Sequence, residues 1–219
     1  MLSKLKIQDV LNKLFEMYPN AKCVLNSSSP FELLVATVLS AQTTDKKVNE
    51  VTDKLFVSHK TPQDMLNLSQ EELELKIKEI GLYKTKSKHI LSLCKSLVEN
   101  YNSEVPSTME ELITLDGVGR KTSNVVLSNA FDIPTIAVDT HVFRVANRIG
   151  LSEGKDVTKV EDQLMKNIPK KQWIRAHHTL IFHGRNLCIA RKPKCSECRI
   201  NSICEFNIKN RRENEYLVH

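Results

Sequence analysis

The sequence predicts an all-α fold, and three of its features carry that prediction. Apolar residues recur at intervals of three and four, and serine stands three positions before glutamate where several such stretches begin. Few segments alternate polar and apolar residues over any useful length. Glycine and proline are sparse, at 6 and 7 of 219 residues, which favours helices.

The first part of the chain contains three predicted helices. The N-terminal one is marked by the apolar stripe Ile7, Val10, Leu11, Leu14 and Phe15. The second, FELLVATVLSAQ, follows a predicted capping box at Ser29 and Glu32, with Pro30 at the first helical position. The third is marked by the stripe Val48, Val51, Leu55 and Phe56.

Later helices show the same two signals. Two more capping boxes are predicted, at Ser69 with Glu72 and at Ser107 with Glu110. A further apolar stripe is formed by Ile90, Cys94, Leu97, Val98 and Tyr101. Gly81 and Gly150 stand where helix C-caps are expected, because glycine readily adopts the left-handed conformation that ends a helix.

Length, charge and composition bound the remaining possibilities. A chain of 219 residues can form one large domain or two small ones, and without a Gly/Ser linker a second domain must pack closely on the first. The formal charge of +6 favours a polyanionic partner. The N-terminus lacks a signal peptide's apolar core, and no run reaches membrane-spanning length. We therefore expect a cytoplasmic protein with reduced cysteines.

Four of the six cysteines are gathered near the C-terminus with the spacing C-x6-C-x2-C-x5-C: Cys188, Cys195, Cys198 and Cys204. In a reducing compartment such a cluster predicts a metal site rather than disulfides. Four thiolates fit either an all-cysteine zinc site or a [4Fe–4S] cluster. A single short C-x2-C pair favours iron–sulfur, and the spacing leaves zinc open. The isolated Cys23 and Cys94 are interpreted as buried thiols.

Three cations lie between the first two of these cysteines: Arg191, Lys192 and Lys194. A metal at both ends of the loop would hold them in place, and Pro193 limits the flexibility of the backbone. Such a loop suits phosphate groups. The alternative is an ordinary solvated basic loop.

The stretch STMEELITLDGVGRKTSNVVL contains a second candidate site. A helix capped at Ser107 is expected to end at Leu115, and a new helix is expected to begin near Arg120. Between them, the G-V-G sequence at Gly117–Gly119 permits a tight turn with a positive φ and close backbone approach to a ligand. Amides at the start of the following helix would then face an anion such as a DNA phosphate.

Lys121 and Asp139 are the candidates for covalent chemistry. A lysine amine can attack a sugar carbon and form a Schiff base once its proton is removed, which the positive potential of Arg120 and the helix N-terminus would favour. The alternative is that Lys121 only contacts a phosphate. Asp139 follows an apolar run and precedes a helix, where an aspartate commonly serves only as N-cap. His141 is expected to pack or form a hydrogen bond.

Three motifs in this order resemble the bacterial endonuclease III family: LDGVGRKTSNVV, VDTHVFRVANR and the cysteine spacing. These are bifunctional DNA glycosylases and AP lyases of the helix-hairpin-helix superfamily. The likeness covers nearly the whole chain and includes LSAQTTD at 39–45 and IGLYKTKS at 80–87. One departure is Asp116, where the family usually has proline, and we expect its charge to weaken DNA binding by up to ~1 kcal/mol.

The resemblance implies a two-lobed helix-hairpin-helix glycosylase fold. A six-helix barrel would occupy 23–133, and a discontinuous domain, 1–22 with 134–219, would hold a [4Fe–4S] cluster in the loop 188–204. Double-stranded DNA would lie across the cleft between the lobes. The family, and not the spacing, decides for iron over zinc. The protein would be a monomer of the bacterial cytoplasm that acts at the nucleoid.

The resemblance also implies an activity, namely base excision repair of oxidised pyrimidines or abasic sites. Lys121 and Asp139 would be the catalytic residues of a Schiff-base glycosylase step, and β-elimination would then cut the strand 3′ to the abasic site. Gln42 would fill the gap left by the extruded base, and Leu82 would insert into the opposite strand. The residues expected to contact DNA are Gln42, Leu82, Gly117, Val118, Gly119, Arg120, Thr122, His141, Arg191, Lys192 and Lys194.

Three other functions are alternatives to this one. A monofunctional adenine or mismatch glycosylase of the same superfamily lacks a lysine at the position of Lys121, and the adenine-specific type needs a further C-terminal domain. A DNA-binding protein without enzymatic activity would use the hairpin with a zinc knuckle. A redox protein is disfavoured because the cysteines follow a complete set of residues for DNA processing, namely the hairpin, Lys121 and Asp139.

Overall fold

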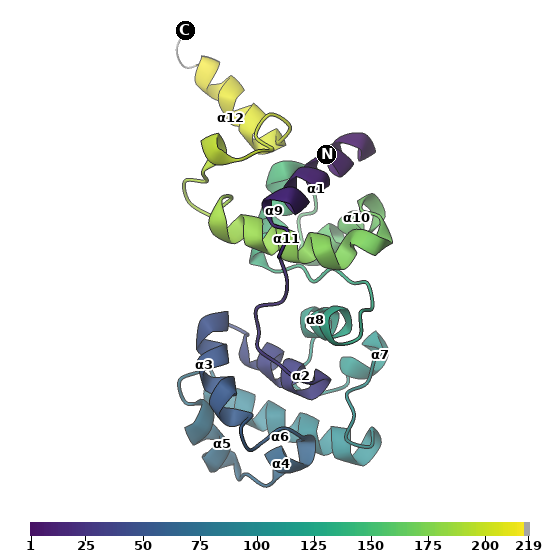
Figure 1. The fold of residues 1–219 in the computed structure, drawn as a ribbon, viewed down its shortest axis with the longest axis vertical. Helices are drawn as coiled ribbons and strands as arrows, with labels where there is room; N and C mark the ends of the chain where they lie inside the picture. Colours follow the sequence, from purple (N-terminus) through teal and green to yellow (C-terminus); the bar gives the residue numbers. More distant parts are fainter. Residues whose placement is uncertain (217–219) are drawn as a thin grey trace. The chain divides into compact units, whose positions relative to one another are not determined.

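The computed structural model describes residues 1–216, and within that range the chain is helical and contains no strand (Figure 1). The predicted all-α class is confirmed. The chain divides into two compact units, Val24–Ile133 and a discontinuous unit made of Met1–Cys23 with the chain from Pro134 onward. Among the described residues, no helix is both long and apolar enough to cross a bilayer.

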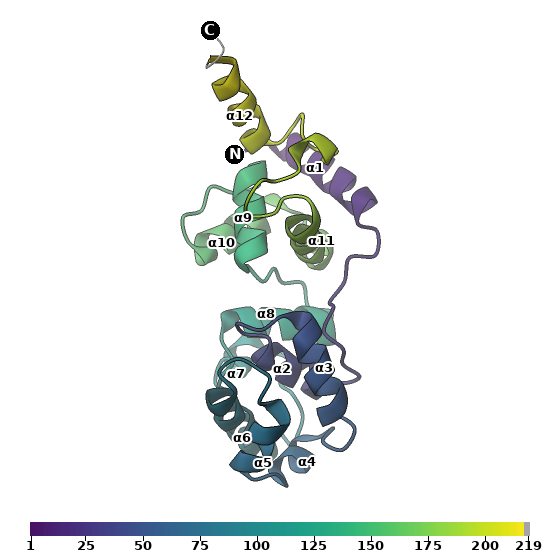
Figure 2. The same ribbon diagram turned by 90° about the vertical axis from the view of Figure 1, so that its left-hand side faces the viewer.

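The middle unit, Val24–Ile133, is built around two helices (Figure 2). Its elements are α2 (Pro30–Leu39), α3 (Asp45–Leu55), α4 (Pro62–Leu66), α5 (Gln70–Ile77), α6 (Tyr83–Asn100), α7 (Met109–Leu112) and α8 (Arg120–Ala130). Helix α2 is buried from Phe31 to Leu39, as expected of a helix that is apolar on all sides. It packs against α3, α6 and α8, while the long α6 packs against α4 and α5 as well.

The predicted helix starts of this unit are mostly confirmed. The Ser29 side chain accepts a hydrogen bond from the Glu32 amide, although the Glu32 carboxylate bonds Ser28 rather than closing the predicted box. The capping box at Ser69 is complete. The box predicted at Ser107 is wrong by one residue, because Thr108 caps α7 and accepts from the amide of Glu111. That helix ends at Leu112, not at the predicted Leu115.

The discontinuous unit joins the first helix to the C-terminal part of the chain. Its elements are α1 (Lys4–Met17), α9 (Thr140–Ile149), α10 (Val157–Asn167), η1 (Lys170–Gln172), α11 (Trp173–Asn186), η2 (Cys195–Glu197) and α12 (Glu205–Tyr216). Helix α11 packs against both α1 and α9 (Figure 1). The predicted apolar stripe of α1 is confirmed, since all five of its residues are buried in this unit's core.

Of the two glycines predicted as helix C-caps, one has this role and the other does not. Gly150 is confirmed as the left-handed C-cap of α9, with φ +96°. The prediction for Gly81 is wrong, because the C-cap of α5 is Lys78 and the left-handed residue near this place is Leu82, with φ 60°. A bulky residue in this conformation is unusual and requires support from its surroundings.

Candidate functional site

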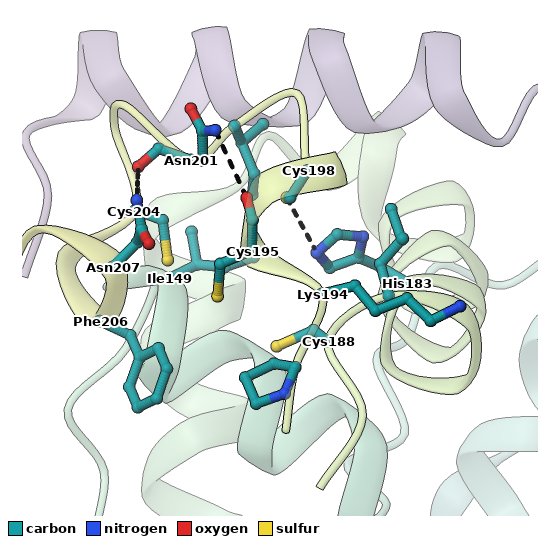
Figure 3. A pocket seen from close by; sticks show the side chains of 13 residues that line it. Ile149, His183, Cys188, Lys194, Cys195, Cys198, Asn201, Cys204, Phe206 and Asn207 are labelled. Atoms are coloured by element: carbon teal, nitrogen blue, oxygen red, sulfur yellow. Dashed lines mark hydrogen bonds between the residues drawn. The ribbon is translucent and has the colours of Figure 1, made fainter. Parts of the chain in front are cut away.

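The four clustered cysteines line one pocket, between the end of α11 and the start of α12 (Figure 3). The sulfur atoms of Cys188, Cys195 and Cys204 point into a common space, and Cys198 lies beside His183 (Figure 3). None of the four forms a disulfide in the described part of the chain. The two isolated cysteines lie elsewhere: Cys94 is buried as predicted, and Cys23 is only half-buried.

The spread of these thiols fits a polynuclear cluster better than a single ion. A zinc ion requires four sulfur atoms at about 2.3 Å from one point. Among the described residues, no three histidine, cysteine or acidic side chains converge closely enough to hold one metal ion. The cysteines instead surround a space of about 330 Å³, part of it open to solvent. An iron–sulfur cluster places inorganic atoms between its four thiolate ligands, so it matches this arrangement.

Burial makes two of these thiols reluctant to ionise. It raises the pKa of Cys198 to about 11 and also raises the pKa of Cys204. Buried thiolates therefore need a positively charged partner in the pocket, which iron supplies. Both the four sulfur donors and their partial burial therefore fit an iron–sulfur cluster.

Arg148 of α9 ties the first half of the cysteine loop to the helical core. Its guanidinium donates to the carbonyl oxygens of Ile189 at 2.7 Å and Ala190 at 2.8 Å, and it lies 3.7 Å from the sulfur of Cys188. It also lies over the ring of Phe206, 4.8 Å from the centroid. The sequence contained no pattern that linked this arginine to the loop.

The basic loop is braced at its backbone and open at its side chains. The Lys194 amide donates to the carbonyl of Leu187 at 3.0 Å, so the loop is held independently of any metal. Arg191, Lys192 and Lys194 are all exposed. The three cations thus stand on a restrained backbone and are free to meet an anionic partner.

The glycine hairpin between α7 and α8 uses its two glycines differently. Gly117 has φ +76°, and a Cβ atom there would lie 2.9 Å from the Cβ of His89. Gly119 is the N-cap of α8 with φ −101°, and a Cβ there would meet nothing within 4 Å. Gly117 is therefore required by the fold, whereas Gly119 leaves open space in front of the first amides of α8. The Val118 side chain is buried in the core of the middle unit, and the DNA contact expected at this residue stays a prediction.

Asp116, the departure from the family pattern, is attached to a neighbouring helix. Its carboxylate accepts a hydrogen bond from the hydroxyl of Ser92 on α6. The residue is exposed at the surface of the hairpin. A hydrogen bond thus restrains the position where a proline ring would otherwise restrict the backbone.

Lys121 lies in the first turn of α8, as predicted, and its side chain is exposed together with that of Arg120. Thr122 beside them is half-buried. An amine at this place is open to a large substrate and stands at the positive end of a helix.

Asp139 belongs to the discontinuous unit, where it begins α9. Its Oδ1 atom accepts a hydrogen bond from the Val142 amide at 2.7 Å, so the predicted N-cap role is confirmed. His141 follows and lies 3.2 Å from a guanidinium nitrogen of Arg144, in the hydrogen-bonding role expected for it. The cap fixes the direction of the carboxylate. Lys121 belongs to the middle unit and Asp139 to the discontinuous unit.

Gln42 and Leu82 share an unusual backbone and are both exposed. Their φ angles are 56° and 60°, and the Leu82 side chain is 58% exposed. A Cβ atom on Gly81 would lie 3.3 Å from the carbonyl oxygen of Gln42, so the two turns are in contact. Leu82 is therefore not a core leucine. The middle unit presents one polar and one apolar side chain side by side on strained turns.

Two family profiles match the chain. The profile described as HhH-GPD superfamily base excision DNA repair protein covers residues 35–170, which include the paired turns, the hairpin and Asp139. The profile described as iron-sulfur binding domain of endonuclease III covers residues 188–204, which are the cysteine segment. The cofactor is therefore an iron–sulfur cluster of the [4Fe–4S] type.

Several known proteins resemble the chain over its length. Endonuclease III of Bacillus subtilis is 51% identical over 219 residues, which cover 100% of this chain and 99% of that protein. Endonuclease III of Haemophilus influenzae is 50% identical over 208 residues, covering 95% and 99%. A solved structure of a trapped endonuclease III–DNA covalent intermediate superposes with a TM-score of 0.92 at 48% identity, covering 96% of this chain and 100% of that one.

Proposed function

This chain belongs to the endonuclease III family of the HhH-GPD superfamily of base excision DNA repair proteins, and from that premise we propose that it is a bifunctional DNA glycosylase and AP lyase. It removes oxidised pyrimidines from duplex DNA and cuts the strand at the resulting abasic site. The observation that carries the proposal is the exposed Lys121 in the first turn after the hairpin, in a chain 48% identical to a protein trapped covalently on DNA.

Catalysis begins with extrusion of the damaged nucleotide. A base inside a duplex cannot be reached, and a lesion that stacks and pairs poorly costs least to extrude. Leu82 inserts its exposed side chain into the opposite strand, since apolar wedges of this kind unstack base steps. Gln42, in contact with the turn of Leu82, fills the space that the base leaves.

Lys121 then forms the covalent intermediate. Its unprotonated Nζ attacks C1′ of the sugar, the bond from C1′ to the base nitrogen breaks, and the base leaves with the bonding electrons and takes up a proton. Asp139 accepts the proton lost from the amine and stabilises positive charge at C1′. The nitrogen lone pair then breaks the bond from C1′ to the ring oxygen O4′, which takes up a proton, and the opened sugar is held as a protonated imine. Loss of a C2′ proton from this imine expels the 3′ phosphate by β-elimination, and water finally hydrolyses the bond between C1′ and Nζ and releases the sugar from the lysine.

The remaining residues hold the DNA backbone. Amides at the start of α8, beyond the open space at Gly119, bind a phosphate, with Arg120 and Thr122 beside them. The basic loop, with Arg191, Lys192 and Lys194, contacts a second region of the backbone. The residues that would hold the [4Fe–4S] cluster are Cys188, Cys195, Cys198 and Cys204, of which the first two flank this loop. The protein acts as a monomer in the bacterial cytoplasm, and its partner is duplex DNA.

The test is reductive trapping on DNA that contains an abasic site. Borohydride should join the wild-type protein covalently to the strand, and Lys121→Ala should abolish the joined species completely while the circular dichroism spectrum stays unchanged. Lys54→Ala, which removes an exposed lysine of α3 in the same unit, is the matched control and should be trapped like wild type. Trapping that persists in Lys121→Ala would assign the nucleophile elsewhere.

Substrate range requires a second measurement. Duplexes with thymine glycol should be cut by wild type, whereas undamaged duplexes should not. Release of the base without strand cleavage would instead identify a monofunctional glycosylase.

A further inference from the structure

Lys86 is a buried lysine with no carboxylate partner among the described residues. It lies on α6, is 4% exposed, and directs its ammonium group at the turn that follows α2. The Nζ atom donates to the carbonyl oxygen of Leu39 at 2.9 Å, to that of Ala41, and to the hydroxyl of Thr43 at 3.3 Å. A charged side chain is rarely buried to this degree unless its hydrogen bonds are satisfied, as they are here.

These acceptors define what Lys86 does locally. The last carbonyl groups of a helix lack partners within the helix, and a cation at the C-terminus interacts favourably with them. Lys86 therefore binds a free carbonyl group at the C-terminus of α2. Its three donors meet three acceptors, and although burial lowers the pKa of Lys86, the amine is surrounded by groups that favour its protonated form. It is thus unsuited to be a second nucleophile.

The same residue is joined to the second exposed turn through its backbone. The Lys86 amide donates to the carbonyl oxygen of Leu82 at 3.0 Å. Its side chain meanwhile holds the carbonyl of Ala41, the residue directly before Gln42. A single residue thus binds both turns, one by its main chain and one by its side chain.

Two further contacts join the turns around this centre. Gly81 packs against the carbonyl oxygen of Gln42, and on the outside the Lys47 ammonium lies 2.8 Å from the Glu79 carboxylate. The outer ion pair is exposed to solvent and contributes little. The buried contacts of Lys86 are therefore the main restraint.

We propose that Lys86 is a positioning residue that holds the turns of Gln42 and Leu82 as one rigid two-pronged element for strand separation. Left-handed conformations at non-glycine residues persist only where the surroundings over-determine them, and Lys86 supplies that restraint. The inference rests on the proposed function. It assigns Lys86 to the extrusion of the base and not to the chemistry at the sugar, which distinguishes it from a lysine that only stabilises the fold.

The experiment compares two substrates in single-turnover cleavage. Lys86→Met, which keeps the length and apolar stem of the side chain, should cut a base-paired duplex lesion roughly tenfold more slowly. It should cut an abasic site in single-stranded DNA of the same sequence within about twofold of wild type, because no strand separation is needed. Lys95→Met is the matched control, since it removes an exposed lysine of the same helix, and both of its rates should equal those of wild type.

A mutant cycle tests whether Lys86 acts through the two turns. In a Gln42→Ala, Leu82→Ala background, the further change Lys86→Met should alter the ratio of duplex to single-strand rates by less than about twofold. Fluorescence of 2-aminopurine opposite the lesion should rise on binding of wild type and rise less with Lys86→Met. These results would support the positioning role.

Two outcomes overturn the inference. Equal losses on both substrates would make Lys86 a general stabilising residue, and a full further loss in the double-alanine background would show that it acts elsewhere. Failure of wild type to cut either substrate would instead refute the proposed function. If Lys86→Met does not fold, Thr43→Val removes one acceptor only and should lower the duplex rate by roughly two- to threefold with the single-strand rate unchanged.

Discussion

The cysteine segment, Cys188–Cys204, and the paired turns at Gln42 and Leu82 each hold exposed side chains on a restrained backbone, but by different means. The cysteine segment is held by four thiols within seventeen neighbouring residues and by Arg148 behind them. The paired turns contain no cofactor ligand. They are held by a buried lysine that joins main-chain atoms more than forty residues apart. One region combines its own hydrogen bonds with the binding of a cofactor, and the other is held by the protein alone.

The difference predicts how each region fails. A region organised by a cofactor should lose its order when one ligand is removed, while the rest of the protein remains folded. In a region organised by buried hydrogen bonds, a substitution should disturb the positions of the exposed side chains before it unfolds the region. Substitutions at the cysteine pocket, at the hairpin glycines and at Asp116, in order of decreasing expected effect, test how local contacts hold the exposed groups of each region.

The largest effect is expected from Cys204→Ser. It removes one thiol of the pocket, and the unit that contains it should lose about 3–5 kcal/mol of unfolding free energy together with the visible absorption of the cluster. Cys94→Ala, a buried cysteine of the other unit, should retain the absorption and cost about 1–2 kcal/mol. Hydrogen exchange is the measurement. Amides of α6 should stay protected from exchange in Cys204→Ser. If they lost this protection, the two regions would not be independent.

An intermediate effect is expected at the hairpin, where two alanine substitutions form a matched pair. Gly117→Ala places a methyl group against His89 at a positive φ and should cost roughly 2–3 kcal/mol of stability in urea denaturation. Gly119→Ala meets no neighbour and should cost less than about 1 kcal/mol. It should nevertheless weaken binding to an abasic-analogue duplex about tenfold, because the methyl group occupies space in front of the α8 amides. Unchanged affinity in fluorescence anisotropy would remove those amides from the DNA interface.

The smallest effect is expected at Asp116. Asp116→Asn keeps an oxygen that can accept from Ser92 and removes the charge, so DNA affinity should rise by up to ~1 kcal/mol. The gain should shrink as salt is added, because the charge is exposed. Asp116→Pro also removes the hydrogen bond to α6. If neither variant changes the affinity at low salt, the carboxylate lies too far from the DNA to matter.

Local patterns predicted a large part of the fold and of the cysteine site. The stripe of α1, the Ser69 box and the Asp139 cap depend on residues within one or two helical turns, so spacing alone indicates them. The error at Ser107 arises because Thr108 with Glu111 satisfies the same rule one residue later. The sequence did not indicate that the Val118 side chain is buried, because a residue between two exposed glycines can still point into the core.

What the sequence could not indicate depends on tertiary contacts. Lys86 and Arg148 are two of 32 basic residues, and neither belongs to a pattern that names its partners. Their importance follows from acceptors forty or more residues away, at Leu39 and Ala190 for example. The left-handed turn at Leu82 is equally hidden, since leucine carries no signal for a positive φ. Long-range support of this kind is visible only in the folded protein.

The division of the chain also has a consequence for its synthesis. The middle unit is continuous, so all of its packing partners leave the ribosome in one stretch. Helix α1 is made first, yet its apolar face packs against α11, which is translated more than 150 residues later. Until then the five large apolar side chains of α1 lack this packing partner and could be bound by a chaperone, so the packing of α1 must wait until α11 has been translated.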